Sequence, residues 1–226
     1  MMKKAMLGGV VLGILVCLGG TAVQAQDMPV ISLFGGYSYE SVNANLTGVS
    51  CILSTCSTGI HGYNFAATWN LTTHLGLEAN LAGHNGSTVP FSEVTPTPGS
   101  IDQDTDLYTY TFGPKVTQSL GNFDIYTHFL VGVTHGHASI TEVGDFCDGP
   151  CVTTAGRGTG FAFQTGGGLD WYHGHWGIRI LEVDYVHGNI DATVNTNTST
   201  TVETFPATMN NVRLATGILF RWGMRK

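Results

Sequence analysis

The fold is decided by the stretch Asn211-Val212-Arg213-Leu214-Ala215-Thr216-Gly217-Ile218-Leu219-Phe220-Arg221-Trp222. Every second residue from Val212 is uncharged and mostly apolar, whereas the residues between them are smaller or polar and include two arginines. Successive side chains of a β-strand point to opposite faces, so this period of two predicts a strand with one apolar face and one mixed face. The run is longer than the strands of roughly five to six residues that soluble domains favour, and it suits a tilted strand that crosses a membrane.

Seven further runs with the same period precede this one. The eight predicted strands are approximately 29–39, 61–72, 74–84, 106–118, 122–137, 159–172, 175–189 and 209–223. Three connections are very short, at Thr73, 119–121 and 173–174. The other four are each about 20 residues long, which is uncommon in compact soluble domains. Long and short connections in strict alternation are typical of outer-membrane barrels, which have tight periplasmic turns and long external loops.

The composition excludes two function classes. Only 11% of the 226 residues are charged, where an ordinary domain carries roughly a quarter. The balance of 9 Lys+Arg against 16 Asp+Glu excludes a basic nucleic-acid-binding surface. The low charge content also excludes a charge-rich disordered chain. The abundance of Gly, with 31 residues, together with Thr, Asn and aromatic residues, favours a single all-β domain.

Residues 1–25 have the features of a secretory signal peptide. Lys3 and Lys4 form a positive n-region, an uncharged stretch follows to Gly20, and Val23-Gln24-Ala25 places small residues before a cleavage point. We therefore predict a signal peptide over 1–25 and a barrel domain over 26–226. An uncleaved membrane anchor is the alternative. Loss of Lys3 and Lys4 leaves 7 positive against 16 negative residues, so the mature chain has a net charge near −9.

Four cysteines remain after the predicted signal peptide, in two close pairs. An exported chain meets an oxidising compartment, so Cys51–Cys56 and Cys147–Cys151 are predicted to be local disulfides. Four zinc thiolates are the alternative, but the spacing matches no familiar zinc site. We predict no metal and no other cofactor.

Alternation alone does not decide which face of the strands is outside. A soluble lipocalin-like barrel would place the apolar face inside, around a ligand. However, aromatic residues gather near the strand ends, as in the interfacial girdles of membrane barrels, and the other face carries both signs of charge. Eight strands leave a lumen just wide enough for side chains to fill. We therefore predict an all-β, eight-stranded antiparallel up-and-down transmembrane barrel, with a soluble binder as the alternative.

The predicted signal peptide is followed by alternating strands, which include the stretches Ile178-Arg179-Ile180-Leu181-Glu182-Val183-Asp184-Tyr185 and Asn211-Val212-Arg213-Leu214-Ala215-Thr216-Gly217-Ile218-Leu219-Phe220. This order resembles the small outer-membrane β-barrel superfamily. That group includes the transmembrane domain of outer-membrane protein A. The resemblance covers essentially the whole mature chain, although its motifs are loose. It implies a place in the outer membrane of a Gram-negative-type bacterium, contact with outer-membrane lipid, and assembly by the barrel-assembly machinery. Such barrels often end on an aromatic residue, whereas Gly223-Met224-Arg225-Lys226 follows Trp222 here.

The mixed faces of the strands predict a set of charged residues in the lumen. Antiparallel pairing of the last two strands would bring Arg213 near Asp184 and Glu182. Unpaired buried charges are costly, so we interpret the set as a structural ion-pair network, with a proton or ion path as the alternative. The predicted network is Glu78, Lys115, Asp124, Asp170, Glu182, Asp184, Arg213 and Arg221, with His128 on the same face. Arg179 breaks the alternation, which predicts either a bulge or a rim position where its side chain snorkels.

The histidines include two H-x-H pairs, His135/His137 and His173/His175. Residues i and i+2 of a strand share a face, so each pair offers two metal ligands. The first pair is predicted at the external end of a strand and the second in a periplasmic turn, so the two pairs cannot form one site. Two ligands alone make a weak metal site, and we interpret these histidines as structural or interfacial.

The segment His137-Ala138-Ser139, with Glu142 close by, resembles the H-x-S dyad and Glu of outer-membrane lipid A deacylases, in which Ser is the nucleophile and His the base. The resemblance implies His137, Ser139 and Glu142 as catalytic residues, and alternation places His137 and Ser139 on the lipid side near the outer rim. However, Glu142 follows Ser139 by only three residues, closer than the pattern of that family. Catalytic triads are recognised by geometry, and a tripeptide recurs by chance.

From these observations we predict a non-enzymatic, porin-like outer-membrane barrel with a structural or surface-interaction role. Its lumen is narrow and filled, and an external ligand or partner would contact the four long loops. We predict no nucleic-acid partner. Three alternatives remain at this stage: a small pore or uptake barrel, a lipid A-modifying enzyme that uses His137 and Ser139, and the soluble lipocalin-like binder.

Overall fold

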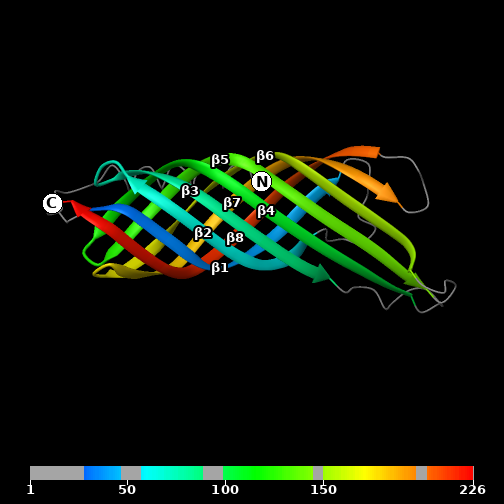
Figure 1. Ribbon diagram of the computed structural model, residues 1–226, viewed down its shortest axis with the longest axis horizontal. Helices are drawn as coiled ribbons and strands as arrows, with labels where there is room; N and C mark the ends of the chain where they lie inside the picture. Colours follow the sequence, from blue (N-terminus) through cyan, green and yellow to red (C-terminus); the bar gives the residue numbers. More distant parts are fainter. Residues whose placement is uncertain (1–27, 47–56, 89–98, 145–149, 197–202, 226) are drawn as a thin grey trace, which may run out of the picture.

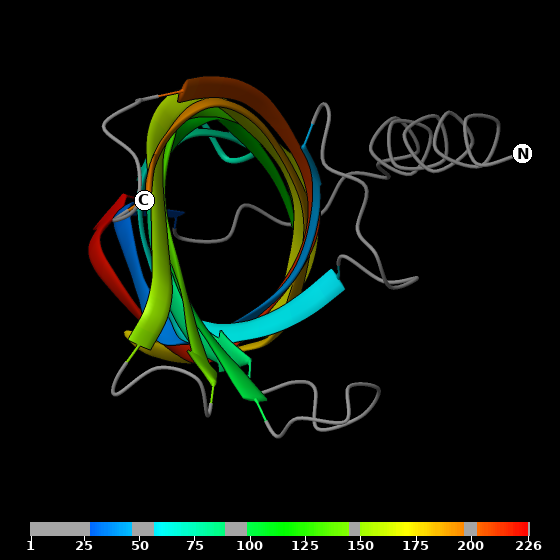
Figure 2. The ribbon, with the colours of Figure 1, turned by 90° about the vertical axis from the view of Figure 1, so that its right-hand side faces the viewer.

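The computed structural model describes residues 28–46, 57–88, 99–144, 150–196 and 203–225. These residues form eight strands: β1 (Met28–Leu46), β2 (Ser57–Asn70), β3 (Leu75–Thr88), β4 (Gly99–Leu120), β5 (Phe123–Gly144), β6 (Pro150–His173), β7 (Trp176–Thr196) and β8 (Glu203–Arg225). Each strand pairs antiparallel with the next, and β8 pairs with β1 to close the barrel. Figure 1 shows the strands running obliquely around one barrel, and Figure 2 shows the closed ring. The predicted all-β eight-stranded barrel is confirmed.

The predicted signal peptide over 1–25 and residues 26 and 27 lie outside the described residues. Within the described ranges, no helix has the length and apolar character needed to cross a membrane.

The register shows how strongly the strands are staggered. Each residue has a partner directly opposite it on the next strand, so the partners can be followed once around the barrel. Starting from Gly35, they are in turn Phe65, Leu81, Tyr110, Val133, Phe161, Asn189, Thr208 and finally Asn45. The circuit returns to β1 ten residues beyond its start, because Gly35 and Asn45 differ by ten positions. Such a stagger accompanies strands tilted by roughly 35–45° from the barrel axis.

Three sharp turns lie at one end of the barrel, here called the turn end. Gly121 and Gly174 have φ of 65° and 66°, the left-handed region that glycine enters without a steric penalty. The third turn, between Asn70 and Leu75, is closed by the backbone N–H groups of Leu71 and Thr72, which donate to the carbonyl oxygen of Leu75 at 2.9 and 3.0 Å. The predicted short connections are thus confirmed at this end.

At the opposite end, here called the loop end, the strands extend further than predicted. β5 continues to Gly144 and β6 begins at Pro150, beyond the predicted limits of 137 and 159. The segments between strand ends are therefore 47–56, 89–98, 145–149 and 197–202, shorter than the predicted loops of about 20 residues. The sequence prediction followed apolar alternation, but the backbone pairing of β5 with β6 continues through 138–144 and 150–156, where that alternation is missing.

The apolar face of the wall points outward. Along β2, Tyr63, Phe65 and Trp69 are 41%, 50% and 54% exposed, while the alternate residues Asn64, Ala66 and Thr68 are buried. Several outward aromatic residues lie close to the turns, including Trp69, Phe123, Trp176 and Trp222. An apolar outside around a polar inside is the arrangement of a barrel surrounded by lipid. It is the reverse of the lipocalin-like alternative.

Candidate functional site

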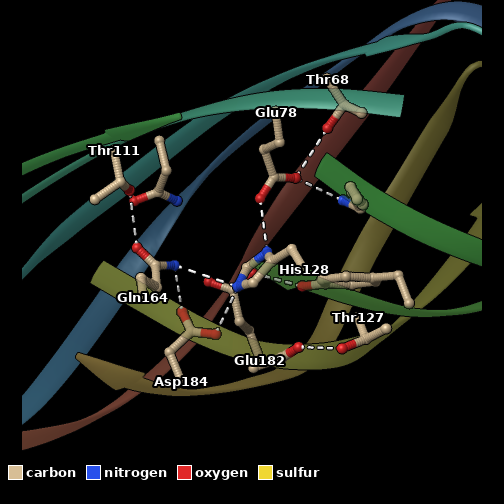
Figure 3. Close-up of polar contacts among 12 residues, drawn as sticks. Thr68, Glu78, Thr111, Thr127, His128, Gln164, Glu182 and Asp184 are labelled. Carbon is tan, nitrogen blue, oxygen red and sulfur yellow. Dashed lines mark hydrogen bonds and ion pairs between the residues drawn. The ribbon is translucent and has the colours of Figure 1, made fainter. Parts of the chain in front are cut away.

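The centre of the lumen is built around His128 of β5 (Figure 3). Its Nδ1 lies 2.8 Å from Glu78 Oε1 on β3, and its Nε2 lies 2.9 Å from Asp184 Oδ1 on β7. All three side chains are buried. A neutral imidazole has a single N–H, so it can donate to both carboxylates only as the imidazolium. The geometry thus suits a positively charged His128 that links opposite sides of the barrel.

Asp184 collects further donors. Its Oδ2 accepts hydrogen bonds from Gln164 Nε2 and from Arg213 Nη2, both at 2.8 Å. The same Arg213 nitrogen lies 3.4 Å from Asn80 Oδ1. Two cationic groups therefore face one fully buried carboxylate, and Asp184 connects β5, β6 and β8 across the lumen.

Glu78 is the second carboxylate beside His128. Its Oε2 accepts from Lys115 Nζ at 2.7 Å and from Thr68 Oγ1 at 2.9 Å. The Lys115 ammonium also lies 3.9 Å from the centre of the Tyr126 ring. This part of the network joins β2, β3, β4 and β5.

Towards the turn end, Arg179 lies between two carboxylates. Its Nε donates to Asp170 Oδ1 at 2.9 Å, and its Nη1 donates to Glu182. The register of β7 shifts between Arg179 and Glu182, so the predicted bulge is confirmed. The alternative rim position is wrong, because Arg179 is only 1% exposed. The bulge turns the guanidinium into the lumen, where it stacks 4.1 Å from the Phe34 ring centre and offsets two buried negative charges.

An ion pair at the turn end completes this half of the network. Arg221 Nη2 donates to Asp124 Oδ2, and the Arg221 guanidinium lies 3.0 Å from the Tyr172 ring centre. The side chains of Arg221 and Asp124 are 14% and 10% exposed, against 0% for those of His128 and Asp184. This pair is therefore where water reaches the network most easily.

A second polar group occupies the loop-end half of the lumen. His84 Nε2 lies 2.8 Å from Ser38 Oγ, and His84 Nδ1 lies 3.2 Å from Glu40 Oε2. Asn211 Nδ2 donates to Glu40 Oε1 at 2.7 Å. Sequence reasoning missed Glu40, since the predicted first strand ended at 39. The alternation Phe34, Gly36, Ser38, Glu40 continues past that point and is the signal that would have found it.

Five apolar side chains cover this polar group on the loop-end side, and we call them the apolar seal. They are Val42, Ile60, Leu107, Ile190 and Met209, which form one buried cluster. Ile60 is the cross-strand partner of Glu40, and Leu107 is the partner of His84. The inner face of the wall thus changes from polar to apolar within one or two residues.

The eight residues of the predicted network are placed as follows. Arg213 contacts Asp184 at 2.8 Å, whereas no hydrogen bond between Arg213 and Glu182 is found among the described contacts. The remaining pairs are Glu78 with Lys115, Asp124 with Arg221, and Asp170 and Glu182 with Arg179. Arg179, Glu40, His84, Tyr126 and Tyr172 are charged or titratable lumen residues that the predicted set lacked.

The H-x-H pairs lie far apart in the barrel. His135 and His137 are on β5 near the loop end, whereas His173 and His175 flank the turn between β6 and β7. His135 Nδ1 lies 2.7 Å from Thr159 Oγ1, and His175 Nδ1 lies 3.1 Å from the Arg221 carbonyl oxygen. Within the described residues, no group of three or more His, Cys, Asp or Glu side chains is arranged to hold a metal ion.

The implied catalytic set lies on β5, within the strand and not in a loop. His137 is exposed and Ser139 is half-buried, and the described contacts include none between them. Their cross-strand partners on β4 are Asp106 and Asp104. Glu142 also lies in β5, but its side chain is outside the description.

The predicted disulfides are not described either. Cys51, Cys56 and Cys147 lie outside the described residues. Cys151 is in β6, and its side chain is likewise outside the description.

Comparison with known proteins identifies the fold. Outer membrane protein OprG from Pseudomonas aeruginosa is 14% identical over 89% of this chain and 99% of its own, with a TM-score of 0.54. Ail, the attachment invasion locus protein of Yersinia pestis, is 18% identical over 85% of this chain and 100% of its own, with a TM-score of 0.52. Ail in complex with the heparin analogue sucrose octasulfate is 16% identical over 84% and 99%, with a TM-score of 0.50. No family model and no curated protein sequence matches the chain. The chain has the fold of the small outer-membrane β-barrels.

Proposed function

We propose that this protein is an outer-membrane barrel of a Gram-negative-type bacterium with a structural or surface-interaction role and a closed lumen. The observation that carries the proposal is the contrast between the two faces of the wall. Ile218 and Trp222 are 61% and 67% exposed, whereas Arg213 on the same strand is fully buried. A lipid environment stabilises this arrangement, since it removes the exposed apolar surface from water.

The filled lumen supports a role that does not depend on transport. Charged side chains from opposite walls meet at its centre, as in the contact of His128 with both Glu78 and Asp184. Moving an ion past such a centre would require paired buried charges to separate, which is costly. We therefore favour a closed barrel over the small pore or uptake barrel.

An enzymatic role has less support. His137 and Ser139 lack a described mutual contact, and a nucleophile needs a base within hydrogen-bond reach. We favour a non-enzymatic protein, and lipid A hydrolysis by purified protein that Ser139→Ala abolishes would contradict this choice.

The loop end is the part of the molecule that suits contact with a partner. β4, β5 and β6 extend at the loop end to Gly99, Gly144 and Pro150. With the turn end in the periplasm, these strand ends would project from the cell. The partners consistent with this placement are outer-membrane lipid around the wall, the barrel-assembly machinery during insertion, and a surface ligand at the loop end.

Outer-membrane insertion predicts a heat-modifiable protein in the outer-membrane fraction. Closed barrels keep all backbone hydrogen bonds within the wall, so they resist detergent until heated. We expect unboiled protein to migrate faster than boiled protein on a denaturing gel. Recovery in the soluble fraction without detergent, and identical migration before and after boiling, would contradict the proposal.

The charge distribution predicts poor binding of sulfated polysaccharides, the class represented by the heparin analogue bound to Ail. Between residues 28 and 224 the Lys and Arg residues are Lys115, Arg157, Arg179, Arg213 and Arg221. All but Arg157 lie in the lumen, and outward positions near the loop end include Asp104 and Asp191. A polyanion would be repelled by this surface.

We therefore expect the refolded protein to pass through a heparin column at physiological salt, and Ail, which has been solved in complex with a heparin analogue, is run for comparison. Salt-sensitive retention that Arg157→Ala removes would show that the loop end binds polyanions despite its net charge.

A further inference from the structure

The apolar seal lies directly against the polar group formed by Glu40, His84 and Ser38. Val42 follows Glu40 by two residues in β1, which runs from the turn end to the loop end. Ile60 and Leu107 are 1% and 3% exposed and are the cross-strand partners of Glu40 and His84. The seal therefore separates the polar part of the lumen from the loop end.

Below the seal, polar contacts run through the lumen to the turn end. Asn80 Nδ2 donates to Asn64 Oδ1 at 2.9 Å, and Asn64 Nδ2 donates to Glu182 Oε1 at 2.8 Å. Glu182 contacts Arg179, which binds Asp170. Tyr172, whose hydroxyl lies 3.4 Å from Asp170 Oδ2, then leads to the Arg221–Asp124 pair at the turn end.

One interruption divides this series of contacts. Glu40 and Arg213 are cross-strand partners in the lumen, but the described hydrogen bonds do not join them. Arg213 Nε and Nη1 are buried and have no hydrogen-bond partner among the described residues, and Glu40 Oε2 and His84 Nδ1, which lie 3.2 Å from each other, have no other partner there. Buried polar atoms of this kind are normally satisfied by an internal water molecule, which makes two to four hydrogen bonds in such sites. The donors of Arg213 on one side of the interruption, and the Glu40 and His84 atoms on the other, are placed to share one such water molecule.

We infer that the lumen is a polar column that water and protons reach from the turn end through the Arg221–Asp124 pair, and whose exit at the loop end is blocked by the apolar seal. Near the turn end the column passes beside a second buried apolar cluster, with Arg179 against Phe34 and Arg221 against Tyr172. A water molecule held by Arg213, Glu40 and His84 joins the two halves of the column. The seal closes the path because a narrow apolar constriction excludes water and so interrupts any hydrogen-bonded route. The ion pairs below the seal fill the column, but they are polar groups that hydrogen-bond to water.

The experiment replaces two residues of the seal with small polar ones. We compare wild type, Ile60→Ser/Leu107→Ser and the control Phe65→Ser/Tyr110→Ser in liposomes that contain a pH-sensitive dye. The control changes lipid-facing side chains on the same two strands, β2 and β4. After an external pH step, we expect proton entry through the seal variant to be about tenfold faster than through wild type, and the control to match wild type.

Folding is verified by gel migration before and after boiling, and Met209→Ser provides a milder opening of the same seal if the double variant does not fold. A folded seal variant, double or single, with the proton permeability of wild type would overturn the inference and leave the proposed closed barrel intact. Rapid proton entry through wild type would instead contradict both the seal and the closed lumen. Equal acceleration in the control would also overturn the inference, because proton entry would then not depend on the seal residues.

Discussion

Replacement of Asp184 by leucine is expected to lower the free energy of unfolding by about 3–5 kcal/mol, the typical cost of removing one partner from a buried ion pair. Asp184 accepts hydrogen bonds from Gln164 and Arg213 and contacts His128, all buried in the lumen. Leucine would leave the Arg213 charge without its nearest anion. Urea unfolding of the protein refolded in lipid vesicles, followed by tryptophan fluorescence, measures the change.

The matched control is Asp191→Leu, which removes an exposed carboxylate from the same strand. It is expected to change the free energy of unfolding by less than about 0.5 kcal/mol. The double variant Asp184→Leu/Arg213→Leu should be less destabilised than the sum of the single changes, because no unpaired charge remains between these positions. Additive losses would show that the two residues stabilise the barrel independently.

Gly166→Ala is expected to destabilise the barrel by about 1–3 kcal/mol, the usual effect of overpacking. A Cβ at Gly166 would lie 2.1 Å from Asp184 Oδ1 and 2.2 Å from the Val183 carbonyl oxygen. Both the strand pairing and the central carboxylate would therefore have to move. The midpoint of heat-induced migration change and the urea midpoint should both fall.

Gly188→Ala serves as the control on the neighbouring strand. There a Cβ would meet Thr134 Cγ2 at 2.9 Å and Met209 Cε at 3.3 Å, which are side-chain atoms that can shift. We expect it to be clearly less destabilising than Gly166→Ala. Equal losses would mean that crowding by any added methyl group, and not the position of Asp184, governs stability here.

The fold could be predicted from the sequence because alternation and turn chemistry are local signals. The stretch that ends in Phe220 and Trp222 has a period of two, and Gly121 and Gly174 lie in turns that need a positive φ. The loop-end limits of the strands could not be predicted in the same way. β5 and β6 extend there through backbone pairing, which leaves no apolar period in the sequence.

The lumen was less predictable because alternation assigns a residue to a face but not to a partner. Arg179 lies out of phase with Glu182, and only the bulge in β7 brings both side chains into the lumen. The contact of His128 with Asp184 joins residues 56 positions apart, and a sequence read strand by strand contains no sign of it. The position of the apolar seal beside Glu40 and His84 depends on the stagger of the strands, which becomes known only with the register.

The pairing of β8 with β1 has a consequence for the order of folding. All other pairings join strands that are neighbours in the sequence, so these hairpins can form early and locally. The seam between β8 and β1 brings together distant segments, and the bond from Asn211 to Glu40 spans 171 positions. Until the seam closes, Glu40 would face hydrocarbon without Asn211, its hydrogen-bond partner on β8, which is strongly unfavourable. Closure of the cylinder must therefore accompany entry into the bilayer, and a chain that enters as an open sheet would stall with its charges exposed.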